Sequence, residues 1–285
     1  MKLGIVFEGG ASRGLFSCGV MDVLLEEKII ADYVIGVSAG IAYGTTYASG
    51  QIGRNLELST KYMHDKHYMG FRHLINPKKR SFYNMDFAFR EIPEKLVPYD
   101  FEAFRQNPAK SVATLTNMQT GKAEYFVLPK EDREKHLQLL WASCALPFLF
   151  RPVDIDGNLY MDGGISDPIP YKCAISEGCD KIITVLTRER SYSKSSDAGL
   201  KIAKLAFRKF PNFTKALELR PEKYNQSRRE IFELADKGQI LAIMPKDSSE
   251  YKRIERDPER LTAMYMDGYN ITKAMMPQIK KYLDI

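Results

Sequence analysis

The stretch YVIGVSAG, residues 33–40, joins a short apolar run to a turn of small residues around one serine. Its first part, Tyr33–Val37, has the composition of a buried strand, and the small residues that follow predict a helix. Gly36, Ser38 and Gly40 form a G-x-S-x-G pattern. Between a strand and a helix, this pattern lifts a serine above a sheet as a nucleophile. The stretch therefore predicts a local fold and a candidate for chemistry.

A similar unit precedes it in the chain. Leu3–Phe7 is a short apolar run that ends in glycines, and Ser12–Glu27 shows helical spacing of its apolar residues. The expected buried stripe of this helix consists of Leu15, Val20, Val23 and Leu24. Strand, loop and helix thus occur twice in succession, which is typical of a parallel sheet flanked by helices.

Later segments extend this pattern. Strands are expected at residues 111–115, 123–127, 181–186 and 239–244. Two shorter runs, 153–155 and 159–161, flank Asp156-Gly157-Asn158 and predict a hairpin. The dipeptide Asp257-Pro258 predicts a helix start, and Gly268 is expected to separate two C-terminal helices.

The polar, serine-rich segment 189–199 predicts a domain boundary. Residues 1–190 would form an α/β domain. Residues 191–285 would form a mainly helical extension packed on that domain.

The chain has 285 residues, of which 44% are hydrophobic and 27% charged, so a packed globular protein is expected. The formal net charge of +6 suits anionic surfaces such as phospholipid or nucleic acid, although many ordinary proteins are as basic. The apolar run at the start is too short for a signal sequence, and no run is long enough to span a membrane. The four cysteines form no C-x-x-C pair, which argues against a disulfide or zinc site.

The glycine-rich segment Glu8–Gly14 also lies between a predicted strand and a predicted helix. Adjacent glycines let successive backbone N–H groups converge on one point, as an anion site requires. The segment fits an oxyanion hole, or a dinucleotide loop, since it is one substitution from G-x-G-x-x-G. The second interpretation needs an acidic residue where this chain has the Ser38 turn, so the first is favoured. Arg13 can contact an anionic head group or the oxyanion, or it is a surface residue.

A serine nucleophile needs a base to take its proton. The histidines are His64, His67, His73 and His136. None lies late in the chain, where the α/β-hydrolase order of triad residues requires one. Asp162 is the favoured base. The two glycines that follow it permit close approach of the backbone, and burial would raise the pKa of its carboxyl and so make it a stronger base. A folded-back histidine, an ordinary hairpin turn at Asp162, and the competitors Asp154, Asp156 and Asp167 stay open.

Three motifs, in this order, resemble the patatin-like phospholipases: the loop at Arg13-Gly14, the turn at Gly36–Gly40 and the triplet Asp162-Gly163-Gly164. Ala145-Leu146-Pro147 also resembles the pattern of that family. The likeness covers roughly residues 3–175, and it is greatest to bacterial members with an extra C-terminal region. It implies an α/β/α sandwich with a mostly parallel sheet, and hydrolysis of lipid acyl esters without a metal or another cofactor.

The resemblance also implies residue roles. Ser38 would be the nucleophile and Asp162 its base. The backbone amides of Gly9, Gly10 and Ala11 would form the oxyanion hole, with Arg13 beside it. The family usually has a third glycine where this chain has Ala11. A methyl group disfavours the positive φ that glycine permits, so the oxyanion hole is altered only if this position needs that conformation.

The sequence therefore predicts a serine hydrolase of lipid acyl esters, of the phospholipase A or lysophospholipase type. The alternatives are an esterase or thioesterase on soluble acyl esters, and a catalytically weak lipid- or nucleotide-binding protein. Basic, aromatic segments at 61–90 and 201–215 suit an anionic membrane surface, or a packed cap with solvated charges. We expect a cytoplasmic protein with peripheral membrane contact and no nucleic-acid partner, while the oligomeric state stays open.

Overall fold

The computed structural model describes residues 1–75, 81–195 and 199–285. The strands are β1 (Leu3–Phe7), β2 (Tyr33–Val37), β3 (Lys110–Asn117), β4 (Ala123–Val127), β5 (Val153–Ile155), β6 (Asn158–Asp162), β7 (Lys181–Val185) and β8 (Leu241–Ile243). The α-helices are α1 (Gly14–Glu26), α2 (Ala39–Ala48), α3 (Arg54–Tyr62), α4 (Phe101–Gln106), α5 (Arg133–Ser143), α6 (Tyr171–Ser176), α7 (Leu200–Ala206), α8 (Pro211–Asp236) and α9 (Pro258–Leu283). The other helical segments are the short 3-10 turns η1 (Ala11–Arg13), η2 (Phe71–Leu74) and η4 (Gly163–Ile165), and the π-helix η3 (Phe87–Leu96).

In the described part of the chain, the strands form one eight-stranded sheet whose pairings run β5-β6-β3-β2-β1-β7-β8. Strand β3 has three partners, because β2 and β6 pair with successive parts of it and β4 pairs with it as well. The neighbours from β3 to β8 are parallel. Strand β4 and the hairpin of β5 and β6 are antiparallel. The predicted mostly parallel sheet is therefore confirmed.

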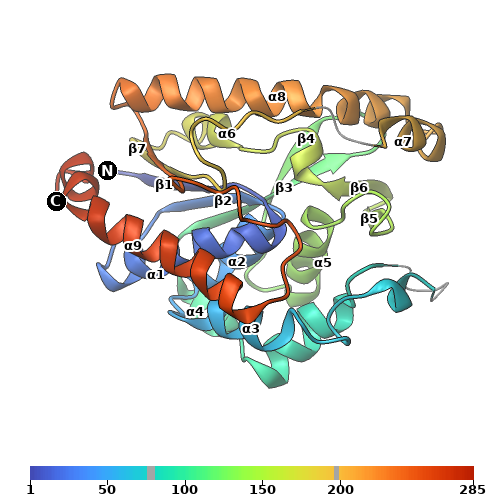
Figure 1. Cartoon of the computed structure of the whole chain (residues 1–285), viewed down its shortest axis with the longest axis horizontal. Helices are drawn as coiled ribbons and strands as arrows, with labels where there is room; N and C mark the ends of the chain where they lie inside the picture. Colours follow the sequence, from blue (N-terminus) through green and yellow to red (C-terminus); the bar gives the residue numbers. More distant parts are fainter. Residues whose placement is uncertain (76–80, 196–198) are drawn as a thin grey trace.

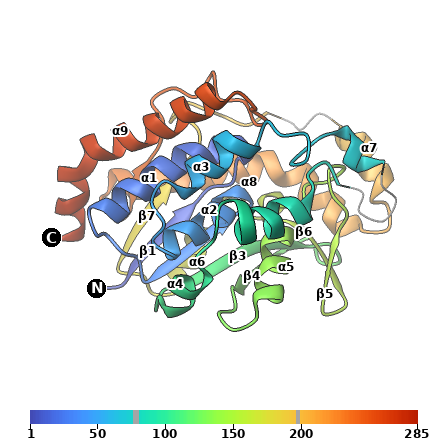
Figure 2. The same ribbon diagram turned by 90° about the horizontal axis from the view of Figure 1, so that it is seen from below.

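Helices cover both faces of this sheet (Figure 1). Helices α6 and α8 lie on one face, and α1, α2 and α9 lie on the other. The view from below shows α9, α1 and α3 running side by side across the second face (Figure 2). The predicted three-layer α/β/α sandwich is confirmed.

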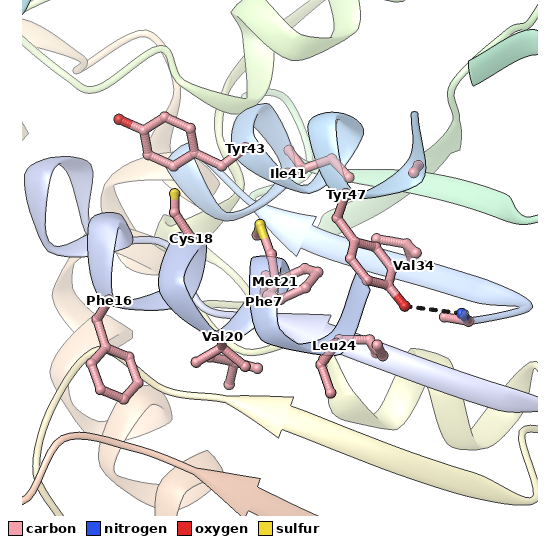
Figure 3. Packing of buried hydrophobic residues seen from close by; sticks show 14 of the residues in the cluster. Phe7, Phe16, Cys18, Val20, Met21, Leu24, Val34, Ile41, Tyr43 and Tyr47 are labelled. Atoms are coloured by element: carbon pink, nitrogen blue, oxygen red, sulfur yellow. Dashed lines mark hydrogen bonds between the residues drawn. The ribbon is translucent and has the colours of Figure 1, made fainter. Parts of the chain in front are cut away.

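The largest part of the core lies between the sheet and the layer of α1 and α2 (Figure 3). Phe7 and Val34 project from the sheet toward this layer, and α1 contributes Phe16, Val20 and Leu24, all fully buried. The apolar residues of α1 are buried on more than one face because α9 covers the side that faces away from the sheet. The expected stripe of α1 is therefore buried together with most of the helix.

Helices α1 and α9 approach each other closely at two glycines. A Cβ atom on Gly19 would lie 2.1 Å from the carbonyl oxygen of Tyr265, and one on Gly268 would lie 2.0 Å from that of Phe16. Any side chain at these positions would therefore push the helices apart. The expectation that Gly268 separates two helices is wrong: α9 runs unbroken through it, and the missing side chain permits packing instead.

Most predicted strands and the hairpin occur where they were expected. The C-terminal strand is shorter than predicted, and it extends the central sheet by pairing with β7. The C-terminal region thus contributes to the sheet as well as to both helical layers. The division at residue 190 stays a prediction. No helix within the described residues is long and apolar enough to cross a membrane.

Candidate active site

Ser38 lies at a sharp turn between β2 and α2. Its backbone has φ 54° and ψ −129°, a conformation rare for a residue with a side chain. Its amide donates to Ser143 Oγ at 2.9 Å, and that hydroxyl donates to the Thr114 carbonyl at 2.9 Å, which ties the turn to β3. A Cβ atom on Gly40 would lie 2.5 Å from the Phe7 carbonyl oxygen. The small residues of the motif therefore allow the turn to pack on β1.

Strand β3 brings Asp162 next to this turn. Val37 of β2 pairs with Thr114, and Asp162 of β6 pairs with the next residue, Leu115. Strand β4 pairs with both Thr114 and Leu115 and so occupies the opposite edge of β3. Strands β2 and β6 must therefore share one edge and end next to each other. This register places the residue after Val37 beside Asp162.

The Asp162 carboxylate is buried and only partly hydrogen-bonded. Oδ1 accepts a hydrogen bond from the Gly164 amide at 2.8 Å, and Oδ2 has no hydrogen-bond partner among the described residues. Burial raises the pKa of this carboxyl, whereas the Gly164 amide, the charge of Arg220 and the nearby Ser38 hydroxyl act in the opposite direction. A buried oxygen without a partner, close to the serine, can accept a proton from it.

The glycine-rich loop lies on the other side of Ser38. Within the described residues, the amides of Gly9, Gly10 and Ala11 donate to no protein acceptor. The next amide, that of Ser12, donates to the Arg253 carbonyl at 3.1 Å, and Arg13 Nε donates to the Gly10 carbonyl at 3.4 Å. Three amides are thus available to an anion in the cleft.

Ala11 has φ +50°, so this position does use the left-handed conformation. The left-handed conformation costs an alanine about 1–2 kcal/mol, whereas a glycine adopts it without this cost. The methyl group therefore strains the loop without preventing its conformation. The position of Ala11 therefore needs the positive φ that the glycine usual in the family would permit.

A polar cleft contains Ser38, Asp162 and the glycine-rich loop. Among the described residues, its cationic side chains are Arg13, Lys194, Arg220 and Arg253, and its carboxylates are Glu8 and Asp162. Burial lowers the pKa of the Arg13 guanidinium, and the positive charge of Arg188 lowers it further. The cleft is therefore a cationic environment around the serine.

An apolar cavity meets the polar cleft at Ser38, Ala11 and Leu146. Its wall is mainly aromatic and thioether side chains, including Tyr43, Met63, Tyr68, Tyr83, Met85, Phe89 and Phe150. Several of these come from the aromatic segment 61–90, so these aromatics form a packed cap over the cavity. Lys78, Lys79 and Arg80, which contribute to the predicted charge of that segment, lie outside the described residues.

The other candidate bases lie elsewhere in the described structure. No histidine lines either cavity beside Ser38. His136, although it occurs in a charged stretch of sequence, is buried against Phe104, and burial lowers its pKa to about 4. Asp154 is exposed, Asp156 pairs with Lys135, and Asp167 accepts a hydrogen bond from Tyr125 at 2.7 Å. Within the described ranges, no group of three His, Cys, Asp or Glu side chains is arranged to hold a metal ion.

Four residues of this site were not predicted from the sequence: Ser143, Lys194, Arg220 and Arg253. No local pattern marks them, because three of them follow the motifs by many residues and reach the cleft only through the packing of the C-terminal region. Arg220 shows how: its Nε donates to the Gly164 carbonyl at 2.8 Å. This contact links α8 directly to η4, the short helical segment that follows Asp162.

The fold and this site define an α/β/α protein with a serine at a strand–helix turn beside a buried carboxylate. The chain belongs to the patatin-like phospholipase family, whose model matches residues 5–175. This match confirms the predicted family, which is a family of lipid acyl hydrolases. Residues 210–284 match a second model, described as a domain of unknown function, DUF6363.

Related proteins agree with this assignment. The chain is 26% identical over 189 residues to the uncharacterized protein YjjU of Escherichia coli, a match that covers 65% of this chain and 52% of that protein. It is 25% identical over 203 residues to an uncharacterized NTE family protein, Rv1063c, of Mycobacterium tuberculosis, covering 69% and 52%. These matches span about half the length of the curated relatives.

The crystal structure of VipD from Legionella pneumophila has a similar fold. The TM-score is 0.50 at 14% sequence identity, and the similarity covers 97% of this chain and 66% of that one. At this identity the likeness supports the fold alone.

Proposed function

We propose that this protein is a serine acyl hydrolase that cleaves lipid acyl esters, with Ser38 as nucleophile and Asp162 as base. The observation that carries the proposal is the buried Asp162 Oδ2, which accepts no hydrogen bond from the described residues and lies beside a serine held in a strained turn. A buried acceptor without a partner costs free energy, and such a cost is typical of atoms that have a functional role. Accepting the Ser38 proton is such a role.

The proposed reaction proceeds in two halves. Ser38 Oγ bonds to the ester carbonyl carbon as its proton passes to Asp162 Oδ2. The resulting oxyanion accepts hydrogen bonds from the amides of Gly9, Gly10 and Ala11. The bond to the alcohol oxygen breaks, that oxygen takes the proton from Asp162, and the acyl group stays on Ser38. Water then attacks the acyl carbon as Asp162 takes a proton from it. The bond to Ser38 Oγ breaks and Asp162 returns the proton to that oxygen, which releases the fatty acid and restores Ser38.

The two cavities fit an amphipathic ester. With the carbonyl at Ser38, the acyl chain would occupy the apolar cavity and the alcohol part would lie in the polar cleft. A soluble short-chain ester or thioester would leave most of the apolar cavity empty and lose the free energy of its burial. This favours a lipid over the soluble esters that are the alternative.

A fluorophosphonate probe tests the nucleophile. We expect purified protein to become covalently labelled and Ser38→Ala to remain unlabelled, with both proteins folded by circular dichroism. A panel of long- and short-chain esters then tests the substrate class. Labelling that persists in Ser38→Ala, or no labelling of the wild type, would overturn the proposed nucleophile and favour the binding protein that is the second alternative.

We also propose peripheral contact with an anionic lipid surface. Phe148, between α5 and β5, and Ile202 and Leu205 on α7 are 51%, 65% and 69% exposed, so large apolar side chains face the solvent here. Lys201 and Lys204 lie beside them on α7, while Ala203 on its other face is buried. Co-sedimentation with vesicles should require anionic lipid, weaken with salt and decrease in Ile202→Ser. Binding that depends on neither lipid charge nor salt would contradict this.

A further inference from the structure

A second cavity adjoins the apolar cavity beside Ser38. Five residues line both cavities: Ala42, Tyr43, Tyr68, Ala88 and Phe89. No described residue lines both the second cavity and the polar cleft. The three spaces therefore follow one another, from the polar cleft through the apolar cavity to the second cavity. An acyl chain that starts at Ser38 and fills the apolar cavity would end against the five shared residues.

The wall of the second cavity is mainly apolar. Ile92 of η3 and Leu140 of α5 contribute to it. The charged side chain of this wall, Arg54, is engaged by the protein itself, because its guanidinium donates to the carbonyls of Val97 and Pro98 at 2.9 and 3.0 Å. An apolar wall offers few partners to water. The second cavity therefore suits more of the same hydrocarbon that fills the first.

Three of the five shared residues are large enough to divide the space, namely Tyr43, Tyr68 and Phe89. Tyr43 is fixed, because it is buried and its hydroxyl shares a hydrogen bond with Ser59 Oγ at 3.2 Å. Tyr68 packs edge-on against Tyr83, and their ring centroids lie 5.7 Å apart. Phe89 is only half-buried and has no hydroxyl to fix it. Phe89 is therefore the large residue of this partition that can be replaced without breaking either contact.

The segment that carries Phe89 has an irregular backbone. It is the π-helix η3, which also contains Pro93. Such segments are rare and frequently occur at functional sites. Ala88 and Phe89 in its first turn both line the two cavities, so a small and a large residue stand next to each other in the partition. The size of the side chain at position 89 therefore decides how far the space that begins at Ser38 extends.

We propose that Phe89 is a specificity-determining residue, which ends the acyl site and so limits the length of the acyl chain. This inference rests on the proposed function, because it takes Ser38 as the point where the acyl chain begins. Each methylene buried in an apolar site increases affinity about fourfold, whereas a methylene that cannot pass the partition gains nothing. A smaller side chain at position 89 should therefore favour long chains over short ones.

Equilibrium binding to the Ser38→Ala protein tests this proposal without turnover. The ligands are octanoylglycerol, dodecanoylglycerol and hexadecanoylglycerol, which share one head group and differ only in chain length. Trp141 is the single tryptophan of the chain, and it packs against the cluster that contains Met85 and Phe150 of the apolar cavity, so its fluorescence follows binding. We expect Phe89→Ala to raise the affinity for hexadecanoylglycerol relative to octanoylglycerol by about tenfold, as two further buried methylenes would produce.

The matched control is Phe126→Ala, which removes the same ring from a half-buried position on β4 that lines neither cavity. We expect this variant to keep the affinity ratio of its parent. Phe89→Leu is the milder variant to measure if Phe89→Ala is not folded by circular dichroism. An unchanged ratio in a folded Phe89 variant, an equal rise in Phe126→Ala, or a parent that binds none of the three ligands would overturn the proposal.

These outcomes are separate from those of the proposed function. Failure of fluorophosphonate labelling in the wild type removes the nucleophile, whereas the affinity ratio is measured without one. Conversely, a labelled wild type combined with an unchanged ratio in Phe89→Ala keeps the hydrolase and removes the role of Phe89.

Discussion

Ser12 and Glu255 exchange two hydrogen bonds although 243 positions separate them in the sequence. The Glu255 amide donates to Ser12 Oγ at 3.0 Å, and that hydroxyl donates to the Glu255 carbonyl at 3.4 Å. The Ser12 amide adds a third contact, to the Arg253 carbonyl. The loop before α9 therefore holds the glycine-rich loop in place. The C-terminal region supports the proposed oxyanion hole as well as lining the cleft.

Ser12→Ala should weaken this contact. It leaves the buried Glu255 amide without an acceptor, which costs about 1–3 kcal/mol of unfolding free energy, and we expect a lower kcat because the glycine-rich loop is less well held. Urea denaturation and ester hydrolysis measure the two effects. The control is Ser17→Ala on α1, where the buried hydroxyl has no hydrogen-bond partner in the described structure. Equal losses in both variants would argue against the Ser12 contact as the cause.

Ala11→Gly should stabilise the protein. Glycine removes the cost of the left-handed conformation but increases the entropy of the unfolded chain, so we expect a net gain of about 0.5–1 kcal/mol. Catalysis should be retained because the amide keeps its direction. Thermal unfolding and kcat check this, with Ala263→Gly on the exposed face of α9 as a control that should destabilise. A destabilised Ala11→Gly would show that the alanine methyl group contributes more by packing than it costs in strain.

The pH dependence of hydrolysis should report the ionisation of Asp162. Only its ionised form can accept the Ser38 proton, and burial raises its pKa. Activity on an uncharged ester should therefore fall as the pH decreases, at a pH above the ordinary aspartate value of about 4. Asp162→Asn should reduce kcat by about 10²- to 10⁴-fold in a folded protein. Retained turnover in Asp162→Asn would show that another residue is the base.

Arg220 provides a second test of this ionisation. Its positive charge lowers the pKa of Asp162, so Arg220→Gln should move the acid limb of the kcat/KM profile to higher pH. Arg229→Gln, on the exposed side of the same helix, should leave the profile unchanged. An unshifted profile in Arg220→Gln would mean that this arginine acts only through its hydrogen bond to the Gly164 carbonyl.

His136 should make the protein less stable in acid without taking part in catalysis. Burial lowers its pKa to about 4, whereas in the unfolded chain the value is about 6.5. As the pH falls through this window, the unfolded chain binds a proton that the folded protein does not. The free energy of unfolding should therefore decrease by up to about 1.4 kcal/mol per pH unit. Urea denaturation should show a weaker dependence in His136→Gln but not in His67→Gln, whose histidine is exposed.

The local motifs were predictable because each depends on neighbouring residues. A strand followed by a small-residue turn and a helix defines the environment of Ser38 within eight residues, 33–40. The same holds for the glycine-rich loop and for the turn at Asp162-Gly163-Gly164. The role of Gly268 was not predictable, because a helix-breaking glycine and a close-packing glycine look alike without the partner helix.

The sequence by itself determined the alternation of strands and helices, the serine turn and the candidate base, because these follow from short-range pattern and backbone sterics. The tertiary structure alone decided that β2 and β6 end side by side on β3, which brings Ser38 and Asp162 together. It also decided that Arg220 and Arg253 line the cleft. Such contacts depend on the register of strands and the packing of α8 and the loop before α9, and no local pattern in the chain encodes them.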